Sequence, residues 1–318
     1  MYPLKLKSVL KEKIWGGRKL ESLNKDLPDG DIGESWEVAC HRNGKSVVVN
    51  GKYKGMNLCE LLSENSKEIL GDGYYDRFPL LVKFIHASKE LSVQVHPDDD
   101  YSLKHEGDLG KTEAWYILDA SEDAKLILGN KGCSVQEIVS TSKQGKMEEC
   151  LNYINVKAGD FFYVPSGMVH GIGGDILLIE IQENSDTTYR IFDYDRGREL
   201  HVEKAEDVVK RNLVGKKKVA TIKKINKDVL VERFVRSRYF TIDKITLRGE
   251  IESSTSGSFE IYTCISGSGL IKYGQEEIGI LKGETVIIPA SLGTYSLKGQ
   301  MELVKSFIEE FSSSDIAV

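Results

Sequence analysis

Short runs of β-branched and aromatic residues, separated by Gly, Asp, Asn and Lys, recur along this chain. Runs of this length between turn-forming residues predict β-strands. The clearest are SWEVAC (35–40), KSVVVN (45–50), LLVKFI (80–85), LSVQVH (91–96), AWYIL (114–118), AKLILG (124–129), FFYVP (161–165) and DILLIEIQ (175–182). The pattern therefore predicts a mainly β protein.

Helical periodicity is confined to a few stretches, for example 57–69, 134–152 and 203–211. In the second, Val135, Ile138 and Val139 recur at helical spacing before Gly145 weakens the pattern. From about residue 235 the strands resume without helices, at 238–247, 259–267, 269–274, 277–283, 285–290 and 301–308. Regularly spaced short strands are typical of a β-sandwich or barrel.

An internal repeat refines this expectation. Residues 158–167 read AGDFFYVPSG and residues 282–291 read KGETVIIPAS; upstream, TEAWYIL (112–118) resembles FEIYTCI (259–265). The copies align once the first is allowed an insertion that matches the helical stretch 134–152. Composition alone can also produce such a repeat, but we favour duplication. We expect two related β-barrels in tandem, over 1–234, with helical insertions, and over 235–318.

Composition bounds the class of protein. A chain of 318 residues can bury the cores of two domains. Hydrophobic residues make up 40% and charged residues 29%, as in ordinary globular proteins. A net charge of −6 offers no basic footprint for nucleic acid, so an anionic substrate needs locally placed positive charge.

The cysteines and the apolar runs predict where the protein resides. The five cysteines are scattered and never form a CxxC pair, which predicts reduced thiols. Lysines interrupt every apolar stretch of the N-terminal segment, so we expect no signal peptide. No apolar run approaches the roughly 18 residues of a membrane span. We predict a cytoplasmic protein without membrane association.

Three segments carry candidate metal chemistry: LSVQVHP with Gln94 and His96, GKTEAW with Glu113, and VPSGMVHGIGG with His170. Side chains two apart on a strand share a face, so Gln94 and His96 can enter one cavity. Imidazole nitrogens and carboxylate oxygens are ligands for a zinc-like divalent metal. A lone histidine is more often a hydrogen-bonded core residue, so the prediction rests on the joint set.

The second copy of the repeat lacks this set. His170 lies five residues after Pro165, whereas Thr294 lies five residues after Pro289, and the segment before Glu260 contains no histidine. We therefore expect the C-terminal barrel to lack metal ligands.

Seven collinear segments together resemble the type I mannose-6-phosphate isomerase family, in its short bacterial form, within the cupin superfamily. They are WGG (15–17), GESWEVA (33–39), FPLLVKFI (78–85), LSVQVHPDD (91–99), GKTEAWYIL (110–118), GDFFYVPSGMVHGIG (159–173) and IEIQENSDTTYRIFDYDR (179–196). The resemblance implies two cupin-like β-barrels of the jelly-roll type. It covers the N-terminal two-thirds closely and the remaining third more loosely.

The resemblance also implies one Zn²⁺ per chain, held by His96, Glu113, His170 and Gln94. Gln94 is open to two interpretations, because an amide oxygen is a weak zinc ligand that could instead support a neighbouring ligand. The implied reaction interconverts D-mannose 6-phosphate and D-fructose 6-phosphate through a cis-enediol, with the metal as Lewis acid. The implied partner is a small sugar phosphate, and we expect a monomer or weak homodimer.

Cations and carboxylates complete the expected site. Arg190 matches the family's arginine in NSDTTYR, Lys111 shares a strand face with Glu113, and Lys83 is a charge within an apolar run. We expect all three to bind substrate, with Arg190 and Lys111 also catalytic; structural ion pairs are the alternative for Arg190 and Lys83. Glu180 and Asp186 are the candidates for proton transfer.

Two other functions fit a cupin-like pocket. One is another metal-dependent cupin enzyme, such as an Fe(II)-dependent dioxygenase, and the other is a sugar-phosphate-binding protein without catalysis. The complete set His96, Glu113, His170 and Arg190 favours an enzyme, because a degenerate binder would resemble the second barrel.

Overall fold

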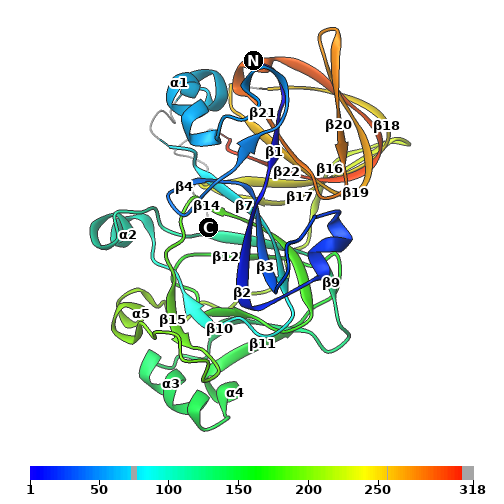
Figure 1. Cartoon of the computed structure of the whole chain (residues 1–318). Coiled ribbons are helices and arrows are strands. Elements are labelled where there is room, and N and C mark those ends of the chain that lie inside the picture. The colour runs from blue at the N-terminus through cyan, green and yellow to red at the C-terminus, as the bar shows by residue number, and fades with distance from the viewer. Residues whose placement is uncertain (73–76, 256, 310–318) are drawn as a thin grey trace.

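The computed structural model describes residues 1–72, 77–255 and 257–309, and within these ranges the chain is mainly β, as predicted (Figure 1). Its strands form sheets of six, five and nine strands and one small hairpin. The hairpin consists of β4 (Cys40–His41) and β5 (Gly44–Lys45).

The six-stranded sheet is the central layer. Its order is β12 (Phe161–Val164), β9 (Glu113–Ala120), β14 (Ile176–Glu183), β7 (Leu80–Ala87), β3 (Ile32–Val38) and β2 (Val9–Gly17). Its inner strands β3, β7 and β14 are buried on both faces, with every residue buried. A sheet covered on both sides reads as a continuous hydrophobic run, which explains LLVKFI and ILLIEI.

The five-stranded sheet faces one side of this layer. Its order is β11 (Leu151–Asn155), β10 (Lys125–Asn130), β13 (His170–Ile172), β8 (Val93–Val95) and β15 (Tyr189–Phe192). Trp115, Phe162 and Leu178 of the central sheet share one buried cluster with Leu126 and Ile172 of this sheet. Each such side chain contributes about 1.5–3 kcal/mol on burial.

Side chains alternate along β8 (Val93–Val95) between the two faces of the five-stranded sheet. Val93 and Val95 lie in a separate cluster with Val135 of α3 (Val135–Lys143) and Ala205 of α5 (Val202–Val208), which cover the outer face of the five-stranded sheet. The residue between the two valines must therefore point inward, toward the central sheet. This places the predicted ligand segment on the enclosed face.

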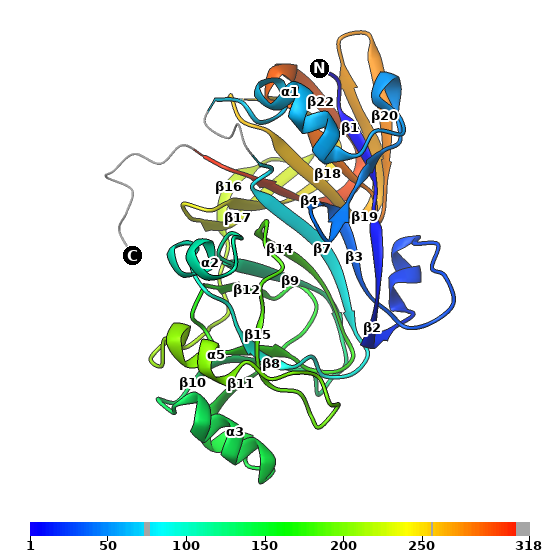
Figure 2. The same ribbon diagram turned by 60° about the vertical axis from the view of Figure 1, so that its left-hand side comes forward.

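The nine-stranded sheet packs against the other side of the central layer. Its main path is β16 (Thr221–Ile225), β17 (Val229–Arg236), β18 (Thr241–Ser254), β22 (Thr294–Phe307), β19 (Glu260–Tyr273), β21 (Thr285–Ile288), β1 (Leu4–Lys7) and β6 (Val47–Val48), and β20 (Glu276–Leu281) pairs with β19. In Figures 1 and 2 the N-terminal strand β1 lies among the C-terminal strands, and Leu4 is paired with Ile287. The nine-stranded sheet thus contains strands from both sides of residue 234. The division into two domains at that residue stays a prediction.

Closure into two tandem barrels is not confirmed. The strand orders of the described residues are open paths whose end strands are not paired with each other. The fold is an arrangement of facing sheets built from antiparallel strand pairs, which confirms the coarser part of the prediction, a mainly β protein.

The helices lie close to the predicted stretches, with one addition. The structure has α1 (Leu58–Leu70), α2 (Asp99–His105), α3, α4 (Met147–Cys150) and α5, with short 3₁₀ turns η1 (Lys19–Leu23), η2 (Gly51–Tyr53) and η3 (Ala290–Leu292). The stretch 134–152 is not one helix: it divides near Gly145, whose φ of 71° is incompatible with a continuous helix, and ends in β11. The sequence interpretation missed α2, although Asp98 caps its first turn.

The cysteine prediction is wrong for four of the five residues. Cys40 is bonded to Cys59, Cys133 is bonded to Cys150, and only Cys264 is a free, buried thiol. The partners lie 19 and 17 residues apart, so spacing gave no CxxC signal. Each pair was brought together by the fold, Cys40–Cys59 between the β4–β5 hairpin and α1.

Within the described residues, no helix is both long and apolar enough to cross a membrane.

Candidate metal centre and substrate cavity

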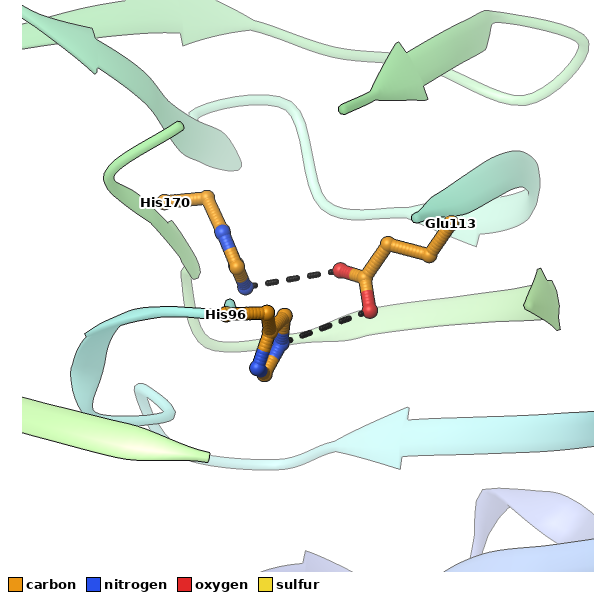
Figure 3. Close-up of side chains that lie close together, drawn as sticks. All are labelled: His96, Glu113 and His170. Atoms are coloured by element: carbon orange, nitrogen blue, oxygen red, sulfur yellow. Dashed lines mark ion pairs between the residues drawn. The ribbon is translucent and has the colours of Figure 1, made fainter. Parts of the chain in front are cut away.

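His96, Glu113 and His170 converge between the central and five-stranded sheets (Figure 3). His96 follows β8, Glu113 begins β9 and His170 begins β13, so the three side chains come from separate strands. Their ligand atoms lie within 4.8 Å of one another, and all three residues are buried. The structure thus brings together the three ligands expected from the sequence.

The two histidines are oriented for coordination through Nε2. Nδ1 of His96 lies 2.9 Å from the Thr187 carbonyl oxygen, and Nδ1 of His170 lies 2.9 Å from that of Met168. A carbonyl can only accept, so each Nδ1 carries the proton and each Nε2 keeps a lone pair. Burial, aided by the charge of Lys111, lowers the pKa of His96 to about 3, and burial also lowers the pKa of His170. Both rings are therefore neutral, as metal ligands must be.

Glu113 supplies the negative charge. Its Oε2 lies 3.5 Å from Nε2 of His96 and its Oε1 lies 3.4 Å from Nε2 of His170 (Figure 3). Burial raises the pKa of Glu113, but the charge of Lys111 outweighs burial and holds that pKa well below the usual range. Both carboxylate oxygens are buried without a hydrogen bond. An ionised carboxylate with free lone pairs facing two imidazoles fits a divalent cation.

Lys111 lies beside this centre. Its Nζ is 2.8 Å from Oε2 of Glu113 and 2.9 Å from Nε2 of His96. The expectation of a shared strand face is wrong, because β9 begins only at Glu113, but Lys111 still contacts Glu113 from the segment just before the strand.

Gln94 reaches the same centre from β8. Its Nε2 lies 3.2 Å from Nε2 of His170, and its Oε1 accepts a hydrogen bond from Ser92 at 3.2 Å. Rotation of the amide would turn the oxygen toward the histidine and the centre. The position fits either interpretation of Gln94, as a ligand or as a neighbour of a ligand.

A cavity of about 260 Å³ opens beside the centre. The expected substrate-site residues all line it: Lys83, Gln94, Lys111, Glu180, Asp186 and Arg190. Trp15, for which the sequence favours packing but leaves a sugar-facing ring possible, also lines the cavity; the polar lining residues that the sequence interpretation missed are Lys13, Glu34, Ser92, Thr188 and Arg198. Glu34 was detectable in principle, because it is a charged residue within the buried strand IGESWEV.

The cavity wall contains a buried charge pair. Lys83 donates to Oε1 of Glu180 at 2.8 Å and to Oε1 of Gln182 at 2.5 Å, and the Trp115 indole donates to Oε2 of Glu180 at 3.0 Å. Burial lowers the pKa of Lys83, but the charges of Glu180 and Glu34 reverse this and raise it above its usual value. Glu180 thus has both oxygens engaged, as in the structural ion pair considered as an alternative for Lys83.

Arg190 and Arg198 both line the cavity, and Arg198 donates to the buried carboxylate of Asp193. Arg190 Nη1 donates to the Glu199 carbonyl oxygen at 2.7 Å, while its buried Nε has no hydrogen-bond partner. Burial and the charge of Arg198 lower the pKa of Arg190. Two neighbouring guanidiniums and an unsatisfied donor are features of an anion site.

The matching position in the C-terminal sheet has different chemistry. Glu260 accepts from Lys305 Nζ at 2.7 Å and from the Tyr262 hydroxyl at 3.2 Å, and Tyr295 also donates to it. A lysine ammonium and two phenols thus surround this carboxylate, where imidazoles surround Glu113.

Comparison with known proteins places the chain in a family. Residues 3–148 match the family description "Phosphomannose isomerase type I, catalytic domain", and residues 231–308 match "Mannose-6-phosphate isomerase, cupin domain". The chain is 41% identical over 313 residues to a mannose-6-phosphate isomerase of Bacillus subtilis, covering 96% of this chain and 99% of that protein. This chain belongs to the type I phosphomannose isomerase family. It is therefore an isomerase, as the resemblance of its motifs indicated.

Other relatives agree. A mannose-6-phosphate isomerase of Streptococcus mutans is 39% identical over 320 residues, covering 97% of this chain and 99% of that protein. The crystal structure of mannose 6-phosphate isomerase from Bacillus subtilis superposes with a TM-score of 0.90 at 39% identity, covering 96% of this chain and 99% of that one. A phosphomannose isomerase variant from Salmonella typhimurium shares the fold, with a TM-score of 0.79, 14% identity, and coverage of 98% and 100%.

Proposed function

We propose that this isomerase interconverts D-mannose 6-phosphate and D-fructose 6-phosphate. The observation that carries the proposal is one cavity lined by Arg190 and also by Lys111 and Gln94, the two residues that contact the His–His–Glu centre. A sugar phosphate needs both: oxygen ligands for its reacting carbons and positive charge for its phosphate. Relatives about 40% identical over nearly the full chain carry this activity in their names.

Arg190 marks the proposed phosphate site. It would hold the phosphate dianion through charge-assisted hydrogen bonds, with its free Nε as one donor, while Arg198, which donates to Asp193, would add positive charge beside it. Lys13 lines the same cavity and adds positive charge. Lys83 is less suited to substrate contact, because its ammonium group already donates hydrogen bonds to Glu180 and Gln182.

The proposed cofactor is one Zn²⁺, held by His96, Glu113 and His170, with Gln94 as a candidate fourth ligand. Neutral imidazoles, a carboxylate and no thiolate suit zinc and leave a position open for substrate. When bound, the ion would polarise the substrate oxygens at C1 and C2 and stabilise negative charge that develops there.

Asp186 is the proposed proton carrier. Its carboxylate lines the cavity, one oxygen accepts from Asn43 at 2.8 Å, and the other has no hydrogen-bond partner among the described residues. Burial raises its pKa, but Lys83 and the Asn43 amide outweigh this and lower it below the usual value, so Asp186 is ionised and can act as a base. It would take the proton from C2 of the aldose, giving a cis-enediolate, and return that proton to C1, while the hydroxyl proton passes from O2 to O1.

Glu180 is the weaker candidate for proton transfer. Both of its oxygens already accept hydrogen bonds, from Lys83 and from Trp115, so accepting a proton would break a buried network. Glu180 would instead keep Lys83 and the cavity wall in place. Lys111, beside Glu113 and His96, would donate to a substrate oxygen as negative charge develops on it.

Two competing functions are disfavoured. Family membership favours isomerisation over Fe(II)-dependent oxygenation. A binding protein without catalysis would not need an intact metal centre. Glu260 illustrates a carboxylate without such a centre, because Lys305 donates to it where histidines face Glu113.

The deciding experiment is metal analysis of purified protein together with a coupled assay for fructose 6-phosphate formation. We expect one zinc per chain and turnover that is lost on chelation and restored by Zn²⁺. Oxygen consumption with Fe(II), or tight sugar-phosphate binding without turnover, would contradict the proposal.

Arg190→Ala tests the proposed phosphate site. We expect normal zinc content but a loss of about 100-fold or more in kcat/KM, because one guanidinium in a desolvated site contributes several kcal/mol. Arg211→Ala, at an exposed pair with Glu206, is the control and should keep wild-type kinetics. A wild-type kcat/KM for Arg190→Ala would remove Arg190 from the site.

The partners, the oligomeric state and the cellular location of the enzyme stay predictions. A small sugar phosphate as partner follows from the proposed reaction; the absence of nucleic-acid and membrane partners and a monomer or weak homodimer remain expectations from the sequence. The cytoplasmic location is also a prediction, and the two cysteine pairs do not favour it, since such bonds persist mainly in oxidising surroundings.

A further inference from the structure

The β4–β5 hairpin lies outside the substrate cavity but contacts a residue that lines it. Asn43, at the hairpin tip, donates its side-chain amide to Oδ2 of Asp186 at 2.8 Å. No residue of the hairpin lines the cavity described above. Asp186 is thus the cavity-lining residue to which Asn43 donates.

The hairpin is anchored on several sides, so Asn43 has little freedom. His41 is buried, and its Nε2 lies 3.1 Å from Oδ2 of the buried Asp108. The Asn43 backbone N–H donates to Nδ1 of His41 at 3.2 Å, so Nε2 carries the proton and donates to Asp108. The Asn43 carbonyl oxygen accepts from Lys11 Nζ at 2.5 Å.

Packing and a covalent bond fix the base of the hairpin. A Cβ on Gly44 would lie 2.7 Å from Cε3 of Trp36, so the hairpin lies directly against this buried indole. Cys40 is bonded to Cys59 in α1, and its carbonyl oxygen accepts from the Asn184 amide at 2.8 Å. The segment that carries Asp186 is thus tied to the hairpin through Asn184 as well as through Asn43.

We propose that Asn43 is a positioning residue for Asp186: its amide holds one carboxylate oxygen at the rim and leaves the other directed to the substrate. The catalytic part of this inference rests on the proposed function. A neutral donor fixed at 2.8 Å also favours the ionised carboxylate, which a proton acceptor requires. The other charged groups near Asp186 are Lys83 of β7, Lys13 of β2 and Lys111, which favour ionisation, and Glu34 of β3, which opposes it.

Three substitutions test the proposal. Asn43→Ala removes the donor, and Asn43→Asp keeps the shape but places a second carboxylate beside Asp186. Lys45→Ala, at an exposed residue of the same hairpin, is the matched control. Asn43 is itself exposed, so none of these changes should prevent folding, and zinc content and Tm should stay close to wild type.

The readout is the pH profile of kcat/KM for mannose 6-phosphate. We expect the acid limb to move to higher pH by about half a unit to one unit in Asn43→Ala, and further in Asn43→Asp, because a lost donor and an added negative charge both raise the pKa of Asp186. Lys45→Ala should superimpose on wild type. A purely structural role for Asn43 would instead change Tm and leave the limb in place.

A measurement that needs no activity separates this inference from the proposed function. The carboxyl ¹³C resonance of Asp186, assigned by its loss in Asp186→Asn, should titrate at successively higher pH in wild type, Asn43→Ala and Asn43→Asp. Equal midpoints in all three would overturn the inference, even if the enzyme is a mannose-6-phosphate isomerase. Shifted midpoints in an enzyme that does not turn over this sugar would overturn the proposed function while the contact stands.

Discussion

At the scale of single residues, the site depends on strand alternation and on which hydrogen bonds are left unmade. Val93 and Val95 face the helices, so Gln94 between them faces the cavity, and this was predictable from period 2 alone. The absence of hydrogen bonds to the Glu113 carboxylate was not predictable from the sequence, because it depends on how strands β8 and β13 meet β9. The same residue type at Glu260 accepts from Lys305 and two tyrosines.

Glu113→Gln tests this difference directly. Loss of the only carboxylate in the cluster should lower zinc affinity at least about 100-fold and abolish turnover, because a neutral amide is a poor ligand. Glu260→Gln is the matched control and should keep one zinc per chain. Zinc content would be measured by mass spectrometry after dialysis; equal zinc loss in the two variants would contradict the assignment of the centre to Glu113.

Glu183 should make stability depend on pH. Burial, with the nearby charge of Asp99, raises its pKa to about 8 from an ordinary 4.5, and its Oε2 accepts from the Thr112 N–H at 2.7 Å. The folded protein keeps this proton where the unfolded chain has lost it. The resulting stabilisation is therefore complete below pH 4.5 and is lost as the pH rises through 8.

Glu183→Gln removes this titration while keeping an oxygen acceptor for Thr112. The Tm of the variant should approach or fall below that of wild type near pH 5 and exceed it by about 2 °C or more near pH 9. Circular dichroism melts across this range give the measurement. Glu122→Gln, at an exposed position, is the control, and Tm curves for Glu183→Gln that stay parallel to wild type would rule out the raised pKa.

At the scale of elements, end signals decided which helices could be predicted. The helices α1 and α3 begin with complete capping boxes, Asn57 with Glu60 and Ser134 with Glu137, before apolar residues at helical spacing. The missed helix α2 has only seven residues, too few for a periodic pattern. Its single cap, Asp98, is the signal that could have indicated it.

Ser134→Ala tests the cap of α3. The Ser134 hydroxyl accepts from the Glu137 N–H, and the Glu137 carboxylate accepts from the Ser134 N–H at 2.7 Å. Loss of the hydroxyl should lower the free energy of unfolding by about 1 kcal/mol in a urea titration. Gln136→Ala, at an exposed site in the first turn of the same helix, should change it by less than about 0.5 kcal/mol. A Ser134→Ala effect no larger than the Gln136→Ala effect would count against the cap.

At the scale of the whole molecule, segments distant in sequence complete one another's sheets and contacts. The strand β1 pairs with β21, and Lys25 Nζ reaches the Gly283 carbonyl oxygen at 2.6 Å. Gly283 has a φ of 85°, and a Cβ there would lie 1.8 Å from the Leu23 carbonyl oxygen. Its counterpart in the repeat, Gly159, has a φ of 90°, but a Cβ added there would meet no atom within 4 Å.

This pair of glycines separates backbone strain from tertiary contact. Gly159→Ala should cost about 1 kcal/mol, the usual penalty for a side chain at positive φ. Gly283→Ala should cost at least about 3 kcal/mol, because the added methyl group must also displace the η1 backbone. Urea unfolding of both variants gives the two values, and equal losses would show that the contact with Leu23 does not constrain the fold.

The sequence by itself determined the strand-rich class, the inward direction of Gln94 and the identity of the metal-ligand candidates, because alternation and side-chain chemistry are local properties. Only the tertiary structure decided that the ends of β9 and β13 and the residue after β8 meet within 4.8 Å, that Glu34 and Arg198 enter the cavity, and that Cys40 meets Cys59. It also decided that β1 belongs to the C-terminal strands. These pairings depend on which strand edges meet, and edges of similar hydrophobic strands carry no distinguishing pattern in the chain.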